Sequence, residues 1–327
     1  MKQNLMIGSY SQNGIYQIAF KNGTLSSATS ESSFENCSYL YKNKDIIYHV
    51  VEYSDNPLYK NGYVVARNRH LKPISTSKVE GISPCFITVD ISRNMLYVAN
   101  YTDGSMDIFL LNSDGSINNL IFHKKYSSHS HIHHISFSED YKFVFVLDLG
   151  DNTLFAYKII LDNNKLKLQE LHSYHFPNGS APRHLISYQQ NFYVITENSC
   201  ELYQLYFSEQ MGFYKKDCIN LLPSNIKKDD NYTGCAIKLS FDHRFLYTTI
   251  RGHNSISVIK VNPSLEIIQN ISCFGNTPRD IHLDHSETFL LCANQDSSNI
   301  TIFNRHQKTG LLRLKDVYPI SSPACII

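Results

Sequence analysis

Residues suited to acid–base or anion chemistry recur at one position of a repeated pattern. The clearest example is His129, His131 and His133, which lead into a short apolar run that is followed by a polar turn and a second apolar run ending at Asp148. Two antiparallel strands joined by a tight turn place the entrance of the first strand beside the exit of the second. The pattern therefore predicts that these histidines and Asp148 gather at one edge of a sheet.

Equivalent positions further along the chain carry more charged and polar residues. They are Arg183, Glu197, Arg251, His253, Arg279, Asp280 and Gln295. Arginines brought to one edge repel each other and lose hydration. A guanidinium group, however, grips a carboxylate or phosphate through two parallel hydrogen bonds. The set therefore predicts a binding site for a small anion.

Two other interpretations stay open. The three arginines can instead pair with Glu197, Asp148 and Asp280 as struts between neighbouring sheets. The His-x-His-x-His spacing on one strand would put three imidazoles on one face, as in a metal site. The sequence shows no fourth ligand, so we expect neither a metal nor a cofactor.

The elements that must position these residues are short strands. Apolar, aromatic and β-branched residues alternate with polar ones between closely spaced turn signals, and no useful helical period is found. A unit of four such strands recurs roughly every 43 to 53 residues, which is typical of a four-stranded propeller blade. The units begin near Ser38, Ser83, His129, Ala181, Cys235 and Thr277.

The two ends of the chain complement each other. Residues 323–327 supply one first strand, and the strands expected before residue 38 lack one. Pairing them completes a seventh blade and removes an open sheet edge. We therefore expect an all-β protein, a single seven-bladed β-propeller domain over residues 1–327, with the ring closed by the C-terminal strand. First strands line a propeller's channel, so the residues above are predicted at its mouth.

Composition excludes several classes of protein. Hydrophobic residues make up 42%, charged residues 18%, and the net charge is +1. No basic stripe with interleaved aromatics is present, so no nucleic-acid partner is expected. No run reaches the length of a membrane span. The N-terminal apolar run is too short for a signal peptide, so a cytoplasmic location is expected. The eight cysteines form no C-x-x-C pair and are predicted to be buried free thiols.

Five motifs, taken together and in this order, resemble those of one family. They are His129-Ser-His-Ile-His133 with Asp148-Leu-Gly150, Ala181-Pro-Arg-His184 with Glu197, Arg251-Gly-His-Asn-Ser-Ile256, Thr277-Pro-Arg-Asp280, and Ala293-Asn-Gln-Asp296. The family is the seven-bladed propeller lactonases of the 6-phosphogluconolactonase type, which also includes the fungal carboxymuconate lactonising enzyme.

The resemblance implies a metal-free hydrolase that opens a sugar-phosphate lactone in the pentose phosphate route, with catalytic residues at His133, Arg183, Glu197 and Arg251. A carboxylate flanked by arginines is a weak base, so His133 is the favoured base. The remaining edge residues are assigned to substrate binding: Arg279, His131, His129, Asp148, His253 and Gln295. The alternatives are a cycloisomerase acting on a carboxymuconate-like diacid, and a non-catalytic propeller that binds a protein.

Overall fold

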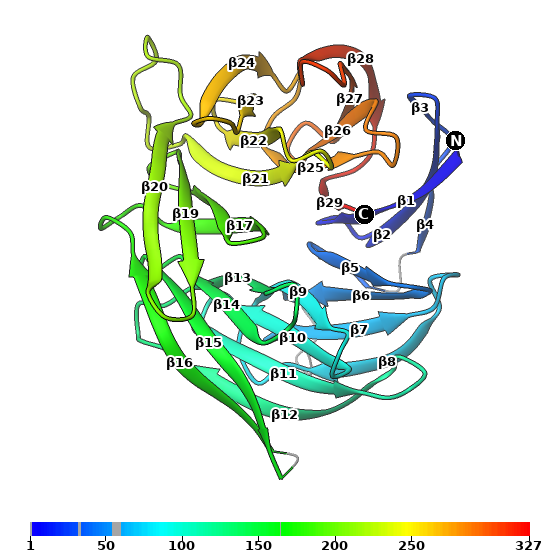
Figure 1. Cartoon of the computed structure of the whole chain (residues 1–327). Helices are drawn as coiled ribbons and strands as arrows, with labels where there is room; N and C mark the ends of the chain where they lie inside the picture. The colour runs from blue at the N-terminus through cyan, green and yellow to red at the C-terminus, as the bar shows by residue number, and fades with distance from the viewer. Residues whose placement is uncertain (1, 32–33, 54–59, 164) are drawn as a thin grey trace. The chain divides into compact units, whose positions relative to one another are not determined.

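The computed structural model describes residues 2–31, 34–53, 60–163 and 165–327, which form strands and turns with no helix among them (Figure 1). Their strands make seven antiparallel sheets. The chain forms two compact units. The central unit is Asn36–Arg183 with Phe207–Tyr214, and the terminal unit is Met1–Glu35, His184–Tyr206 and Lys215–Ile327. No helix in the described ranges is long and apolar enough to cross a membrane.

The central unit contains three four-stranded sheets with neighbouring strands in chain order. Their strands are β5 (Leu40–Asn43), β6 (Ile46–Val51), β7 (Tyr63–Arg67), β8 (Pro73–Lys78), β9 (Pro84–Asp90), β10 (Met95–Asn100), β11 (Ser105–Leu111), β12 (Ile117–Lys125), β13 (Ile132–Phe137), β14 (Phe143–Asp148), β15 (Thr153–Asp162) and β16 (Lys165–His175). The second strand of a sheet is buried and the fourth is largely exposed, as β10 and β12 show. This gradient is the one expected for blades whose outer strands face solvent.

The terminal unit carries three further sheets and most of the sheet β17–β20. Its strands are β1 (Lys2–Ser9), β2 (Ile15–Lys21), β3 (Thr24–Leu25), β4 (Thr29–Glu31), β17 (Pro182–Tyr188), β18 (Asn191–Thr196), β19 (Glu201–Ser208), β20 (Gly212–Asn220), β21 (Thr233–Leu239), β22 (Phe245–Arg251), β23 (Ser255–Lys260), β24 (Glu266–Ser272), β25 (Pro278–Leu283), β26 (Phe289–Asn294), β27 (Asn299–Arg305), β28 (Leu312–Pro319) and β29 (Pro323–Ile326). The six repeat units predicted from the sequence match the six sheets from β5 to β28.

The C-terminal strand joins the N-terminal strands, as the sequence predicts. β29 pairs with β1 in antiparallel register, with Ile326 opposite Ile7, and Figure 1 shows the red strand beside the blue one. The Asp280 carboxylate accepts a hydrogen bond of 2.9 Å from the Ile326 amide. Asp280 was expected at the channel mouth, and the structure shows it attaching this last strand to β25.

Apolar side chains fill the space between neighbouring sheets of the terminal unit. Phe245 and Tyr247 of β22 pack in one buried cluster with Leu290 and Cys292 of β26. All eight cysteines are free thiols, as predicted; six are buried as expected, and two, Cys85 and Cys218, are only partly buried.

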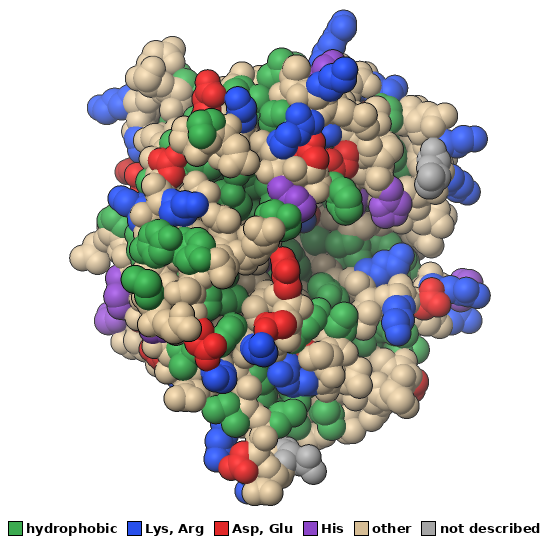
Figure 2. All heavy atoms as spheres, in the orientation of Figure 1, with side chains coloured by type: hydrophobic (Ala, Val, Ile, Leu, Met, Phe, Trp, Pro, Cys, Tyr) green, Lys and Arg blue, Asp and Glu red, His purple; other side chains and the backbone are tan. Residues whose placement is uncertain are grey.

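Charges are mixed on the surface. Figure 2 shows Lys and Arg side chains interspersed with Asp and Glu side chains on the visible face. This distribution agrees with the net charge of +1 and shows no basic stripe on that face.

A buried histidine makes stability depend on pH. His49 is fully buried in β6, its Nε2 accepts a hydrogen bond of 2.9 Å from Arg67, and burial together with the Arg67 charge lowers its pKa to about 3. The unfolded chain binds this proton near pH 6.5, so the folded state loses stability as pH falls from about 6.5 towards 3. Between about pH 7.5 and 5 the expected loss is about 2 kcal/mol.

Urea unfolding at the two pH values measures this loss. A His49→Gln variant should lack that part of the pH dependence, whereas His306→Gln, at an exposed turn, should keep it. An equal pH dependence in the His49→Gln variant and the wild type would show that other groups cause the acid sensitivity.

Candidate active site

The two residues predicted at the exits of β18 and β22 meet in the terminal unit. Glu197 directly follows β18, Arg251 is the last residue of β22, and Oε2 of Glu197 lies 2.8 Å from Nη2 of Arg251. The side chains are 20% and 17% exposed. The ion pair agrees with the interpretation of Arg251 as a strut between neighbouring sheets. It also holds the Arg251 guanidinium group in a largely buried position.

A second guanidinium group lies close to the first. Arg279, in β25, donates a hydrogen bond of 2.6 Å to the Tyr10 hydroxyl, and its guanidinium carbon lies 4.7 Å from the centre of the Tyr10 ring. The pKa of Arg251 is raised overall: burial lowers it, the Cys235 thiol and the Glu197 carboxylate raise it, and the Arg279 charge lowers it. Arg251 therefore interacts with a second cation, Arg279, as well as with the carboxylate of Glu197, and this is an arrangement suited to an anion.

Two of the predicted site residues carry a buried polar atom that retains hydrogen-bonding capacity. Nε of Arg251 and Oε1 of Gln295 are buried, and neither has a hydrogen-bond partner in the described part of the chain. Buried polar atoms are costly to leave unpaired, so both are positioned to bind a ligand or water. His253 is held differently: its Nδ1 lies 2.7 Å from the Ser255 hydroxyl and its ring meets Tyr232 edge to face.

Glycines allow close approach of the main chain beside both residues of the ion pair. Gly252 follows Arg251 with φ of +77°, and a Cβ there would clash with the Asn231 carbonyl oxygen. Gly234 donates a main-chain hydrogen bond of 2.8 Å to the Glu197 carbonyl, and a Cβ there would clash with Thr196. The loop 221–232 therefore lies against the turn that carries Arg251.

Replacing Gly252 with alanine should displace this turn. The positive φ alone costs roughly 1–2 kcal/mol for a residue with a Cβ. The clash with Asn231 adds to that cost. The sequence predicts a catalytic role for Arg251, so its shift should lower kcat/KM about tenfold, since misplaced catalytic groups lose rate steeply. Urea unfolding and assays of the lactone hydrolysis expected from the sequence measure the two effects.

Gly179 supplies a matched control. Its φ is +79°, and a Cβ there would meet nothing within 4 Å. Gly179→Ala should therefore show the backbone cost with little change in activity. Equal stability losses and unchanged activity in both variants would show that the contact with Asn231 does not position Arg251.

The predicted histidines lie in the central unit, in a different arrangement from the one considered. β13 begins at Ile132 and its pairing with β14 shifts between Ile132 and His134, so His129 and His131 precede the strand. The three-histidine strand face is therefore not formed. His133 lies in β13 and is 6% exposed, with its ring 5.9 Å from that of Tyr101.

The other two histidines have distinct surroundings. The His131 ring stacks on Tyr101 with centroids 4.5 Å apart, and its Nδ1 lies 2.8 Å from the Tyr101 carbonyl oxygen. His129 is exposed. Tyr101 was not predicted as a site residue; its position directly after β10, equivalent to Glu197 after β18, is the signal that marks it.

Asp148 and Arg183 are both buried. Oδ1 of Asp148 accepts main-chain hydrogen bonds from His131 (2.9 Å) and Asp151 (3.0 Å), so this carboxylate orders the turn before β13. Arg183 is the second residue of β17 and is 3% exposed. Within the described ranges, no cluster of three or more His, Cys, Asp or Glu side chains could hold a metal ion.

Comparison with known proteins shows the family of this chain. A family model described as "Lactonase, 7-bladed beta-propeller" matches residues 4–327. A 6-phosphogluconolactonase from Bacillus subtilis is 29% identical, with 98% of this chain and 96% of the relative covered. A 6-phosphogluconolactonase from Formosa agariphila is 30% identical, with 94% of each chain covered.

A solved structure has the same fold. The periplasmic gluconolactonase of Pseudomonas aeruginosa superposes with a TM-score of 0.93 at 23% identity, over 100% of this chain and 99% of that one. The seven antiparallel sheets are thus the blades of a propeller, and the chain belongs to the seven-bladed β-propeller lactonase family.

Proposed function

We propose that the protein hydrolyses 6-phosphogluconolactone to 6-phosphogluconate, in the pentose phosphate pathway. The observation that carries the proposal is the Arg251 guanidinium group, held 2.8 Å from Glu197 and interacting electrostatically with Arg279. The names of the two relatives, 6-phosphogluconolactonase, support this substrate. Because sugar phosphates are charged and retained inside cells, we place the protein in the cytoplasm.

The chemistry assigns a role to each group. Water attacks the lactone carbonyl carbon, its proton passes to the base, and the carbonyl electrons move onto oxygen; collapse then breaks the bond to the ring oxygen, which takes a proton. Arg251 stabilises the oxyanion, since a fixed cation aimed at developing charge is worth several kcal/mol. Arg279, oriented by Tyr10, binds the phosphate.

The remaining roles are also proposals. His133 serves as the base, because imidazole is the side chain that most often does so near neutral pH. Glu197 orients water or a sugar hydroxyl, and Arg183 supplies a second cation for the substrate. His131, His129, Asp148, His253 and Gln295 are proposed to contact the sugar or to order the segments that do.

Hydrolysis of freshly prepared 6-phosphogluconolactone tests the proposal. The full-length protein should open the lactone well above its spontaneous rate, with equal rates with and without a chelator. Unphosphorylated gluconolactone should be used less efficiently, because it lacks the group assigned to Arg279. A rate equal to the spontaneous one would contradict the proposal. If the protein then converted a carboxymuconate-type diacid into its lactone, the same arginines would be assigned to the cycloisomerase reaction.

A further inference from the structure

A hollow lies in the terminal unit, away from Arg251 and Glu197. It has a volume of about 330 Å³ and is formed by β18–β20, the β17–β18 and β21–β22 turns, and the loop that precedes β24. Its lining includes Asn191 at the start of β18, whereas Glu197 follows the end of that strand. Six residues of extended chain span about 20 Å, so the hollow lies at the opposite end of the strand.

The hollow contains a buried amide with weak partners. Gln204 is 8% exposed, and its Nε2 lies 3.4 Å from Oδ1 of Asn191 and 3.5 Å from the Tyr193 hydroxyl. Nζ of Lys216 lies 3.3 Å from the same Asn191 oxygen. These distances exceed those of good hydrogen bonds, which cluster near 2.9 Å. The Gln204 amide and the Lys216 ammonium group therefore point at the same acceptor with long, weak hydrogen bonds. A ligand hydroxyl among them would make shorter hydrogen bonds to these groups.

The charges in this hollow balance. Lys216 supplies one cation and the neighbouring Asp217 one anion. The two Asp217 oxygens accept main-chain hydrogen bonds from Cys218 (2.8 Å) and Leu265 (2.9 Å). Arg251 and Arg279 are both cations, whereas Lys216 and Asp217 carry opposite charges. Its donors and acceptors suit a neutral molecule with many hydroxyls, and its volume is within the range of small-molecule sites.

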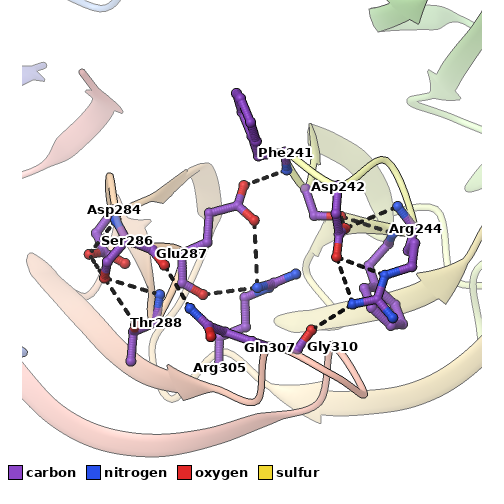
Figure 3. Close-up of polar contacts among 12 residues, drawn as sticks. Phe241, Asp242, Arg244, Asp284, Ser286, Glu287, Thr288, Arg305, Gln307 and Gly310 are labelled. Atoms are coloured by element: carbon purple, nitrogen blue, oxygen red, sulfur yellow. Dashed lines mark hydrogen bonds and ion pairs between the residues drawn. The ribbon is translucent and has the colours of Figure 1, made fainter.

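Two stacked aromatic rings line the hollow, and a third extends their row beyond it. The rings of Tyr188 and His243 stack with centroids 3.5 Å apart, and the Phe241 ring follows at 6.5 Å from His243. Phe241 is 86% exposed. The main-chain amide of Phe241 donates a 2.5 Å hydrogen bond to the Glu287 carboxylate. Figure 3 shows the Phe241 ring pointing away from the polar contacts among the neighbouring residues.

The network in Figure 3 fixes the β21–β22 turn, which carries Phe241 and His243. Arg305 reaches Glu287 through the main-chain carbonyl at 2.9 Å and the carboxylate at 3.6 Å, and Arg244 is held by Asp242 at 2.7 Å. An exposed aromatic ring on a fixed turn presents its electron-rich face, which attracts the weakly positive C–H groups of a sugar ring.

We propose that this hollow is a binding site for a neutral saccharide. Sugar hydroxyls bond to Gln204, Asn191 and the Lys216–Asp217 pair, and a sugar ring lies against the aromatic row of Tyr188, His243 and Phe241. The site is distinct from the one that opens the lactone and does not depend on that function.

Calorimetric titration of the full-length protein with maltose and with glucose tests the proposal. A dissociation constant of about 1 mM or below is expected for at least one sugar. Gln204→Leu removes the central amide and should weaken binding at least about tenfold. His243→Asn removes one ring of the stack at a residue with φ of +57°, which asparagine tolerates, and should weaken binding similarly.

Two controls locate the bound sugar. Arg251→Ala should leave saccharide affinity unchanged, which separates this site from the lactone site. Phe274→Ala, at an exposed ring on another turn, should also leave it unchanged. The absence of saturable binding of either sugar at about 20 mM would overturn the proposal. So would binding that survives both substitutions in the hollow, or binding that disappears with Arg251→Ala.

Discussion

Arg251→Ala is expected to lower kcat for lactone opening by about 10²–10³-fold, the loss typical when one oxyanion-stabilising group is removed. Arg251 is held at 2.8 Å from Glu197 and is largely buried, so the position of its charge is fixed before the substrate binds. Fixed charge needs no reorganisation as the oxyanion forms, and the loss should appear in kcat more than in KM. Steady-state kinetics above the spontaneous rate measure it.

A matched control separates this role from the mere loss of an ion pair. Arg244 pairs with Asp242 at 2.7 Å, but these side chains are 51% and 40% exposed. Arg244→Ala removes an ion pair of similar length and should leave kcat within about twofold of wild type, since exposed pairs contribute little. Thermal unfolding checks that both variants fold. Comparable turnover by folded Arg251→Ala and Arg244→Ala proteins would exclude Arg251 from the chemistry.

Arg251→Lys refines the same test. Lysine keeps the positive charge but lacks the planar fork that binds a carboxylate and an oxyanion together. If charge alone matters, this variant should recover most of the activity. If the geometry of the guanidinium group matters, as the pairing with Glu197 implies, the recovery should be less than about tenfold.

Much of this architecture can be predicted from residue patterns. Strand alternation and turn spacing locate the repeat units, and their register puts Glu197 and Arg251 at equivalent strand exits, where they pair. Register is determined locally, by which face of each strand is apolar, and is therefore visible in a sequence. The same reasoning predicts that β29 joins β1, because an unpaired sheet edge is unfavourable.

Other features of the candidate site depend on contacts between distant segments. Tyr10 holds Arg279 from 269 positions away, and nothing near either residue marks the pair. β13 begins only at Ile132, after His129 and His131, and its register shifts at His133; one extra residue in a strand leaves little trace in an alternating pattern. In the sequence Gly234 resembles any turn glycine, because only the structure shows that its main chain lies against Thr196.

His133→Ala is expected to lower kcat about 10²–10⁴-fold, the range by which a general base contributes. The side chain is 6% exposed in β13 and lies beside the Tyr101 ring, so it is held in a fixed orientation. A base must be unprotonated to accept a proton from water, so wild-type kcat should fall as the solution becomes acidic. The variant should lose that dependence, and added imidazole should restore part of its rate.

The next residue in the chain is a close control. His134 is 8% exposed and its ring packs against Phe86 with centroids 4.2 Å apart. His134→Ala should lower stability through lost packing while kcat stays within about twofold of wild type. Rates that fall equally in the two variants would show that the loss at His133 reflects damage to β13 and not the removal of a base.

Glu197→Gln decides between the two candidate bases. If His133 is the base, this variant should keep a pH-dependent rate and lose at most about tenfold in kcat, because the amide still orients water. If Glu197 is the base, the Glu197→Gln variant should lose as much of its kcat as is expected for His133→Ala, and added imidazole should not restore the rate.

The double variant of His133 and Arg251 tests whether the two residues act in the same step. Substitutions of residues that act in one step cost less together than the sum of their separate effects. The double variant should therefore lose less activity than the two single variants combined.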